Sequence, residues 1–598
     1  MKYLRFAAIV ALAALAVLLL TAFDHDHAFW SQWGRNAQHT GRVEVSGQPL
    51  NKKLADIFYD PFVEQEKAEN VPVEGAEVLT AHYQSTLLDG DSFYMIQKTG
   101  TYPSCNPVGS WFEGADCGPN AWAQLKWNVA RYDWSNSHAV RAWMFPTNWK
   151  PPLNATNINI GAGGLFGWEP VFHPAFASGH LYVPGAGGTV WKVDLHTGKY
   201  ESHINPFAGI TIDTSLTFVS SPLTASDNGD IYYNVIELSS GPNPWQGSDI
   251  AGAWLVKVRH DDSAAVVTYA TLVPNAPPGT STNCPFIFFD PTTLPWPPSP
   301  TATPVTTWCG SQRPPLNLAP AIARDGTVYT ASVAHFDSMV TYFIAVHPDL
   351  TPKWVTSMQN LLTDGCGVLL PIAANGVTDE PNSCRFGTTV GVDPTTNAKG
   401  SANLSDLASS TPTVLPDDSV VVGVTDNYNY SRGHLMHFDA NGNFLNAYTF
   451  GWDSTPAVYK HDGTYSLVIK DNHYPVPAYC FDNNPVCTAI PPVYYVSQID
   501  PNMKVEWSFQ STTIDSTHPN GYEWCVNAPV IDRHGVVYIT SEDGHVYSVD
   551  QGHTGVFTTP RQKIFLLEAL GAAYTPMSIG EDGKEYSQNN GHLFVIGK

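Results

Sequence analysis

Residues 529–540 read Pro-Val-Ile-Asp-Arg-His-Gly-Val-Val-Tyr-Ile-Thr, which combines a proline, a short apolar stretch, a turn and a strand of β-branched and aromatic residues. Variants of this phrase recur from residue 170 onward. Seven copies begin at Pro170, Pro222, Pro320, Pro412, Pro456, Pro529 and Pro576. A strand-turn-strand unit that repeats about every 40 to 50 residues, as between Pro412 and Pro456 or between Pro529 and Pro576, is typical of a β-propeller rather than of stacked helices. The phrase therefore predicts an all-β fold built from one repeating blade.

The number of blades follows from the two ends of the repeat. A unit without the proline precedes the first copy, and its four expected strands are residues 85–90, 93–96, 125–129 and 140–143. The last unit ends with the apolar residues 593–596, which supply only its third strand. We predict that residues 54–59 add the fourth strand, so that the two ends of the chain close the ring and leave no open edge. The expectation is a single eight-bladed propeller over residues 54–598.

The N-terminus and the charge indicate where the protein works. Residues 1–22 contain Lys2 and Arg5 before an apolar run, as in a secretory signal peptide; an uncleaved membrane anchor is the alternative. Residues 23–53 then form a lead-in segment. A net charge of −24 opposes contact with phosphate backbones or anionic lipids. We expect a periplasmic or secreted protein without a nucleic-acid partner, and without membrane contact beyond an uncleaved anchor.

Cysteine spacing predicts disulfide bonds. The chain has 9 cysteines, of which Cys525 stands alone and is expected to be a buried thiol. After an export signal, closely spaced cysteines favour disulfides. The expected pairs are Cys105 with Cys117, Cys284 with Cys309, Cys366 with Cys384, and Cys480 with Cys487.

Each cysteine pair falls inside one of four long insertions, at about 99–122, 272–316, 357–408 and 471–492. Two of these insertions join the second and third strands of a blade, and two join a fourth strand to the next blade. Because strand direction alternates within a blade, both kinds of connection emerge on the same side of the ring. We expect one face of the propeller to carry disulfide-braced loops, which lose less entropy when they bind a partner.

Two further phrases point to a family. Residues 190–199 read Val-Trp-Lys-Val-Asp-Leu-His-Thr-Gly-Lys, and residues 33–41 begin Trp-Gly-Arg-Asn and end His-Thr-Gly. They resemble the pyrroloquinoline-quinone-type repeat propellers of the quinoprotein alcohol dehydrogenase-like superfamily. The resemblance implies the propeller fold and raises pyrroloquinoline quinone and Ca²⁺ as cofactors. The chain lacks the adjacent cysteine pair associated with the quinone-binding dehydrogenases, and without a C-x-x-C-H phrase it predicts no haem.

Polar residues follow the second strands of two neighbouring blades. Asp-Asn-Tyr begins at Asp426 and Asp-Asn-His at Asp471, and Arg432 and Lys470 lie nearby in sequence. Asp and Asn oxygens suit Ca²⁺, and Lys or Arg suits the carboxylates of a quinone; ordinary turn chemistry is the alternative. We expect these residues near the channel mouth, together with His335 and Asp337. The candidate cofactor-binding residues are Asp426, Asn427, Arg432, Lys470, Asp471, Asn472 and His473, with Asp426 and Asp471 as metal ligands.

Two functional hypotheses remain. The chain contains no G-x-S-x-G, H-E-x-x-H, phosphate-binding glycine loop or EF-hand phrase. The first hypothesis is an exported propeller that binds a small ligand or a protein partner on the insertion-bearing face without catalysis. The second is a quinone- and Ca²⁺-dependent dehydrogenase acting on an alcohol or a sugar. The sequence specifies neither the ligand or substrate nor the oligomeric state.

Overall fold

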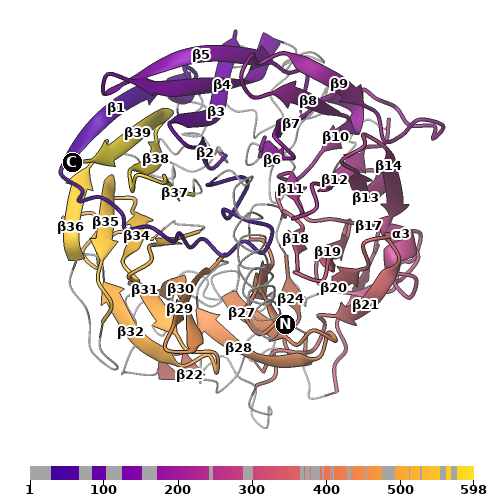
Figure 1. Cartoon of the computed structure of the whole chain (residues 1–598). Coiled ribbons are helices and arrows are strands. Elements are labelled where there is room, and N and C mark those ends of the chain that lie inside the picture. The colour runs from indigo at the N-terminus through magenta and orange to yellow at the C-terminus, as the bar shows by residue number, and fades with distance from the viewer. Residues whose placement is uncertain are drawn as a thin grey trace, which may run out of the picture.

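The computed structural model shows an all-β protein whose strands form eight sheets around a central channel (Figure 1). It describes residues 29–598 except 66, 68–83, 103–123, 151–170, 241–244, 246, 287–300, 364–368, 371–376, 379–390, 394–395, 405, 407–409, 427–432, 451–453, 474–491, 511, 525–527, 553–559 and 568–575. Within the described residues, there is no helix with the length and apolarity needed to cross a membrane. The predicted eight-bladed fold is confirmed.

Each blade is an antiparallel sheet; in blades one to seven the strands run in chain order from the centre outward, whereas the outermost strand of blade eight comes from the N-terminal part of the chain. Blade one contains β2 (Leu87–Asp89), β3 (Ser92–Gly100), β4 (Leu125–Ser135) and β5 (His138–Pro146), and blade two contains β6 (Ala175–Ala177), β7 (His180–Pro184), β8 (Val190–Asp194) and β9 (Tyr200–Ile204). Blade three contains β10 (Thr217–Val219), β11 (Thr224–Ala225), β12 (Ile231–Glu237), β13 (Gly252–Val258) and β14 (Ala264–Thr268). Blade four contains β17 (Gln312–Arg313), β18 (Ala321–Ile322), β19 (Val328–Ala334), β20 (Thr341–Val346) and β21 (Pro352–Ser357). Blade five contains β24 (Ala402–Asn403), β25 (Thr413–Val414), β26 (Val420–Asp426), β27 (Gly433–Phe438) and β28 (Phe444–Phe450). Blade six contains β29 (Ala457–His461), β30 (Thr464–His473), β31 (Val493–Ile499) and β32 (Val505–Gln510), and blade seven contains β33 (Val530–Ile531), β34 (Val537–Thr540), β35 (His545–Val549) and β36 (Pro560–Phe565). Blade eight contains β37 (Ser578–Ile579), β38 (Glu585–Asn589), β39 (His592–Gly597) and β1 (Lys52–Phe58).

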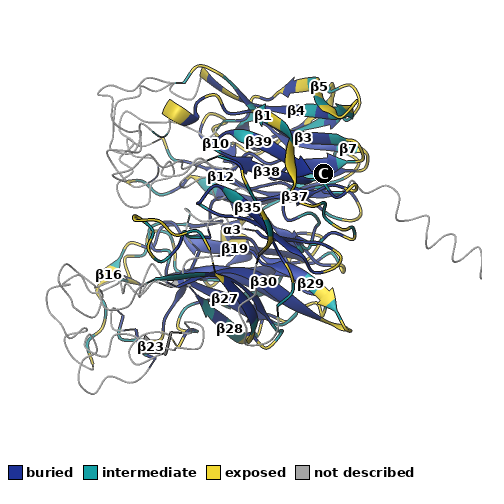
Figure 2. Cartoon of the chain, turned by 90° about the vertical axis from the view of Figure 1, so that its left-hand side faces the viewer, coloured by how far each residue is buried: buried dark blue, intermediate teal, exposed yellow. Residues whose placement is uncertain are grey.

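Short elements of the described residues also lie outside the regular blades. Two hairpins occupy insertions: β15 (Cys284–Pro285) pairs with β16 (Thr306–Thr307), and β22 (Leu369–Leu370) pairs with β23 (Val377–Thr378). Figure 2 shows β16 and β23 projecting from the same side of the ring. A 3-10 turn, η2 (Ala186–Gly188), and a helical turn, α3 (Tyr269–Leu272), also lie between strands.

The proline phrase marks the start of the innermost strand. In four copies the strand begins directly after the proline, for example at Ala321 after Pro320. Blade two requires a correction, because its strand β6 begins at Ala175, directly after Pro174 and not near Pro170. A turn with a left-handed glycine then leads into the second strand, as at Gly326 with φ of 84°. Glycine adopts this conformation without steric cost, which explains why the turn recurs with the phrase.

Neighbouring blades pack through alternate side chains of each strand. Phe93 of blade one lies 5.3 Å from the ring of Tyr586 in blade eight, whereas the next residue, Tyr94, lies 4.9 Å from the ring of Phe176 in blade two. Successive side chains of a strand point to opposite faces of the sheet. Each strand of a blade therefore contributes to two interfaces, one with the preceding blade and one with the following blade.

The last blade joins the two ends of the described chain. Strand β1 pairs with β39 in antiparallel register from Lys52 opposite Gly597 to Phe58 opposite His592. The sheet order is β1-β39-β38-β37, so β1 is the outermost strand of blade eight. The predicted strand, residues 54–59, overlaps this element with a shift of one to two residues.

A segment before β1 lines the inside of the ring. We call residues 30–48 the collar; Figure 1 shows it as an indigo trace in the centre of the propeller. Its residues bond to the inner strands or turns of the eight blades in chain order. The bonds run from Leu88 N–H to Trp30 O (3.0 Å), Phe176 N–H to Ser31 O (2.8 Å), Ala225 N–H to Gln32 Oε1, Ile322 N–H to Ala37 O (2.7 Å), Val414 N–H to Gln38 O (3.0 Å), Val458 N–H to Thr40 O (2.8 Å), Ile531 N–H to Gly41 O (3.0 Å) and Gln48 N–H to Gly583 O (2.7 Å).

The Trp-Gly-Arg-Asn phrase gives the collar its shape. Gly41 N–H donates to Gly34 O at 3.0 Å, and Asn36 Oδ1 accepts from Thr40 N–H at 3.0 Å, so the phrase folds back on itself. Gly41 has φ of 59°, and a Cβ there would lie 2.9 Å from Pro529 O. The fold-back places His39 Nδ1 2.8 Å from Pro412 O, and burial lowers the pKa of His39 to about 4. The phrase thus has a structural role: it presents carbonyl groups to successive blades.

Glu585 makes the stability of blade eight depend on pH. Its side chain is fully buried on β38, and burial raises its pKa to about 9. The unfolded chain ionises near 4.5, so between these values folding must protonate the carboxyl, and the cost rises with pH. We expect Glu585→Gln to stabilise the protein at pH 8 by on the order of 2–4 kcal/mol and to change stability little at pH 4. Urea unfolding at both pH values measures the difference, with exposed Glu581→Gln as the control; an equal effect at both would contradict the prediction.

Candidate functional site

Asp471 and His473 lie together at the end of β30 in blade six. Asp471 Oδ1 lies 2.7 Å from His473 Nε2, and both side chains are 2% exposed. The other oxygen, Oδ2, accepts hydrogen bonds from Tyr448 O–H at 3.0 Å and from Ser497 O–H. Burial and the charge of Asp471 raise the pKa of Tyr448 well above its usual value, so the phenol stays protonated and donates. Tyr448 belongs to β28 of blade five, so these contacts join two blades.

Asn472 faces the opposite interface. Its Nδ2 donates to Trp524 O at 3.1 Å, and Trp524 N–H lies 3.4 Å from its Oδ1. Trp524 precedes the inner strand of blade seven, so alternate residues of this phrase bind alternate neighbours, as strand geometry requires. Lys470 is also buried, at 3% exposed. We expected these residues at the channel mouth; Asp471 contacts blade five and Asn472 contacts the segment before blade seven, whereas His473 contacts Asp471 and Tyr495 within blade six.

The other candidate residues are described only in part. Asp426 is the last residue of β26 and pairs with Ala402, so its backbone is placed. Its side chain, Asn427 and Arg432 lie outside the described residues, as do seven of the nine cysteines, including Cys525. Among the residues that the structure describes, no group of three or more His, Cys, Asp or Glu side chains could hold a metal ion.

The described candidates do not fit a quinone with Ca²⁺. Asp471 Oδ2 accepts two buried hydrogen bonds, Oδ1 lies 2.7 Å from His473 Nε2 without a hydrogen bond between them, and Asn472 bonds to the backbone of Trp524 through both ends of its amide. A Ca²⁺ ion needs six to eight oxygen ligands that can turn toward it. Here the carboxylate would have to leave a tyrosine, a serine and a histidine in a dry interface, which would leave buried polar groups without partners.

A second site, which residue patterns did not single out, lies on the insertion-bearing side. The disulfide Cys284–Cys309 is present with a Cα–Cα distance of 5.3 Å, which confirms one of the four predicted pairs. Next to it, Trp308 stacks on Phe336 with ring centroids 4.3 Å apart, and its indole N–H donates to Gly279 O. Trp308 is 39% exposed and Val305 is 49% exposed. The cross-linked loop therefore presents a fixed aromatic ring to solvent.

Hydrogen bonds hold this loop to blades three and four. Asp249 accepts from Ser311 N–H at 2.8 Å and from Ser311 O–H at 2.7 Å. Phe336 N–H donates to Cys309 O at 3.0 Å. Gly310 has φ of 71°, and a Cβ there would lie 2.8 Å from His335 Cβ, so the chain passes close over blade four. The position of Trp308 is thus fixed by the neighbouring disulfide, by the hydrogen bonds of Asp249 and by stacking on Phe336.

His335 and Arg313 form the buried base of the loop. Arg313 Nε donates to His335 Nδ1 at 2.9 Å, and the guanidinium lies 4.3 Å from the centre of the Trp245 ring. Arg313 also binds both oxygens of Asp406, at 2.8 and 2.6 Å. Burial and the charge of Arg313 lower the pKa of His335 to about 4, so the imidazole is neutral and its Nε2–H donates to Trp245 O at 2.6 Å. The bonds of Arg313 and His335 are made within the protein, so this network positions the loop.

Asp337 is buried beside this network. Its Oδ1 accepts from Met339 N–H at 3.1 Å, and burial raises its pKa to about 7. His335 and Asp337 were expected on the same rim as the candidate cofactor site. In the structure His335 contacts Arg313 and Trp245 at the base of the braced loop, whereas the carboxylate of Asp337 bonds within its own turn.

Solved structures with similar folds include two dehydrogenases and BamB. A europium-containing methanol dehydrogenase gives a TM-score of 0.48 with 11% identity over 95% of this chain and 90% of that chain. The quinohemoprotein alcohol dehydrogenase from Comamonas testosteroni gives 0.47 with 12% identity over 97% and 82%, and BamB from Moraxella catarrhalis gives 0.34 with 12% over 84% and 98%. The resemblance to quinoprotein propellers is one of fold. No protein-family model and no curated protein sequence matches the chain.

Proposed function

We propose that the chain is an exported, non-catalytic propeller that binds a protein partner through the insertion-bearing face, with Trp308 at the centre of the contact. The observation that supports this proposal is the pairing of an exposed tryptophan with a disulfide in the same loop. Tryptophan is enriched among the residues that dominate binding energy at interfaces. A loop that is already cross-linked has less conformational entropy to lose on binding.

The shape of this surface favours a protein over a small molecule. The indole N–H of Trp308 is already bonded within the loop, so its outward surface offers apolar contact without a polar group to satisfy. Val305 extends the apolar surface beside it. A projecting ring offers a flat contact rather than an enclosing cavity, and small ligands prefer enclosing cavities. The quinone-dependent alternative receives no support from Asp471, whose Oδ2 is bonded to Tyr448 and Ser497 and whose Oδ1 lies against His473.

Site-specific photo-cross-linking tests the proposal. The full chain carries benzoylphenylalanine in place of Trp308 in one variant and in place of Tyr200 in the control. Tyr200 is 61% exposed and lies on the outer strand of blade two, away from the insertion. We expect one defined protein adduct from position 308 and none from position 200. The identified partner should then bind a Trp308→Ala variant at least about tenfold more weakly, as expected for an interface centre.

Two results would contradict the proposal. One is the same adducts from both positions, which would mean that the contact is not specific to the insertion. The other is catalysis: if pyrroloquinoline quinone and Ca²⁺ bind saturably to the purified protein and support dye reduction by an alcohol or sugar, the protein is an enzyme. In that case Lys470→Ala should abolish the binding.

A further inference from the structure

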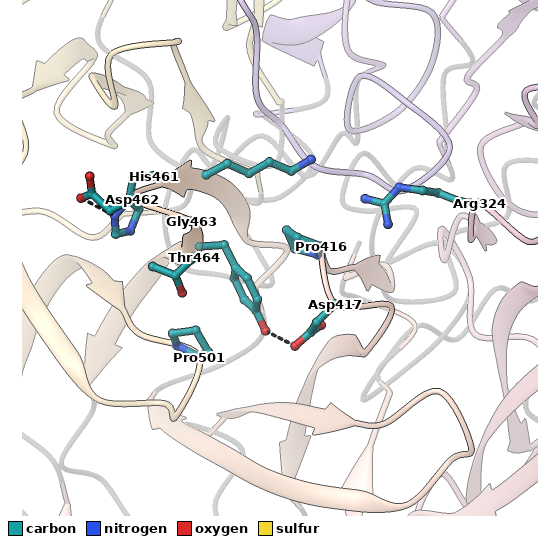
Figure 3. Close-up of a pocket in the computed structure, with 10 residues that line it drawn as sticks. Arg324, Pro416, Asp417, His461, Asp462, Gly463, Thr464 and Pro501 are labelled. Carbon is teal, nitrogen blue, oxygen red and sulfur yellow. Dashed lines mark hydrogen bonds and ion pairs between the residues drawn. The ribbon is translucent and has the colours of Figure 1, made fainter.

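A cavity opens on the face opposite the insertions. Its volume is about 730 Å³, and it lies where the turns between first and second strands of blades five and six approach each other (Figure 3). Those turns lie at the other end of the blade from the insertions, because strand direction alternates. The side chains that carry the argument are Arg324, Asp417, Lys460, Tyr465 and Pro501.

Most charged groups in the cavity have partners. Arg324 Nη1 donates to Asp418 Oδ1 at 2.9 Å. Asp417 accepts from Tyr465 O–H at 2.9 Å and from Ser419 N–H at 3.1 Å, which helps to lower its pKa. Lys460 differs: within the described part of the chain, its ammonium group has neither a hydrogen bond nor an ion pair. Lys460 is an exposed residue that lines the cavity, and its ammonium offers three donors there without a protein acceptor among the described residues.

Nearby charges make this position favourable for an anion. Partial burial lowers the pKa of Lys460, and the charges of Arg324, Arg42 and Arg35 lower it further, whereas Glu44 acts in the opposite direction. Two of these arginines belong to the collar, so the collar brings positive charge to this end of the channel. Arg42 pairs with Glu44 at 3.0 Å and Arg324 with Asp418 at 2.9 Å, so the charge of these two cations is partly balanced, whereas that of Lys460 is not balanced within the described chain. Binding an anion would relieve the repulsion among these cations.

The rest of the lining selects among anions. Asp417, Asp462 and the adjacent Asp418 carry negative charge at the cavity, and they would repel a doubly charged group more strongly than a singly charged one. Pro416, Pro501 and the ring of Tyr465 add apolar surface. We propose that this cavity binds a small monocarboxylate with an apolar body, its carboxylate bonded to Lys460 and to the remaining donors of Arg324.

Ligand-observed NMR with benzoate as the probe tests this site on the full chain. We expect saturable binding with a dissociation constant on the order of 1 mM at low salt. Lys460→Gln should weaken it at least about tenfold, since it removes the ammonium and leaves the turn intact. Thr464→Trp should also abolish it, because Thr464 lines the cavity and a larger side chain would fill the space. Lys199→Gln, an exposed lysine of blade two, is the matched control and should leave binding unchanged.

Three results would overturn the assignment. Equal benzoate affinity of the Lys460→Gln variant, with urea unfolding showing an unchanged fold, would remove Lys460 from the site. Equal affinity for benzyl alcohol would show that the negative charge is irrelevant. Tighter binding of inorganic phosphate than of benzoate would show that a doubly charged anion is preferred. None of these outcomes depends on the partner-binding face, so this inference stands or fails separately from the proposed function.

Discussion

A chain that begins at residue 49 is expected not to form a stable propeller, although it retains every blade strand. It lacks the collar, whose carbonyl groups accept a backbone N–H from the inner strand of six blades. It also lacks Trp30, Trp33 and Val43, which are 1%, 0% and 0% exposed. At about 1 kcal/mol for each hydrogen bond and about 1.5–3 kcal/mol for each buried side chain, the loss is on the order of 10 kcal/mol. That loss is comparable to the whole stability of a typical domain, about 5–15 kcal/mol.

Urea unfolding and limited proteolysis measure this effect, with a chain that begins at residue 29 as the control. The control keeps the collar and should unfold in one transition at higher urea. A synthetic peptide of residues 29–48, added to the shortened chain, should restore protease resistance. The substitution Gly41→Val tests the collar without removing it, because it places a side chain against Pro529 O in a strained backbone conformation. Cooperative unfolding of the shortened chain at the urea concentration of the control would contradict the role of the collar.

The second large effect is expected on removing residues 592–598. These residues contain β39, which lies between β38 and β1, so its loss takes hydrogen-bonded ladders from both sides of the strand. Leu593, Phe594, Val595 and Ile596 are each 0% exposed. At about 1.5–3 kcal/mol for each side chain, their loss costs about 6–12 kcal/mol before the backbone bonds are included. Strand β1 would also lose its partner, so both ends of the chain would become unpaired.

Circular dichroism during thermal unfolding should show no cooperative transition for this variant. Deleting Lys598 alone is the control, because its side chain is exposed and its N–H makes one bond, to Gln48 Oε1 at 3.0 Å. The control should melt within a few degrees of the complete chain, since the loss of one exposed hydrogen bond is worth about 1 kcal/mol. A native-like melting curve for the longer deletion would show that the ring tolerates an open blade.

Local sequence patterns predicted the blades well. A turn glycine in the left-handed region and a β-branched strand are local features, so residues such as Gly326 and the strand that follows it could be located without knowledge of their neighbours. The shift from Pro170 to Pro174 shows the limit of this approach. Both prolines precede apolar residues in the sequence, and only pairing with β7 distinguishes them.

The partners of the candidate residues could not be predicted from local patterns. Asp471 binds Tyr448 and Ser497, which lie on two other strands, and Asn472 binds the residue Trp524 of the next blade. A repeated Asp-Asn phrase predicts polar groups at a strand end, but which interface they enter depends on register and on the adjacent blade. Trp308 was missed for a similar reason: only the stacking on Phe336 and the exposed ring distinguish it from other tryptophans. Its position one residue before Cys309 was the available signal.

Repeat proteins commonly change length in evolution when a repeat is duplicated or deleted, because each repeat contacts only its neighbours. The collar removes this freedom. Its residues bond to the blades in chain order, through acceptor oxygens from Trp30 at the first blade to Gly41 at the seventh and through the N–H of Gln48 at the eighth, so each blade has its own bond to the collar. The inner strand of a duplicated blade would have no collar group to bond to, and the collar bonds of every later blade would be out of register. Blade number in this lineage can change only if the N-terminal segment changes with it.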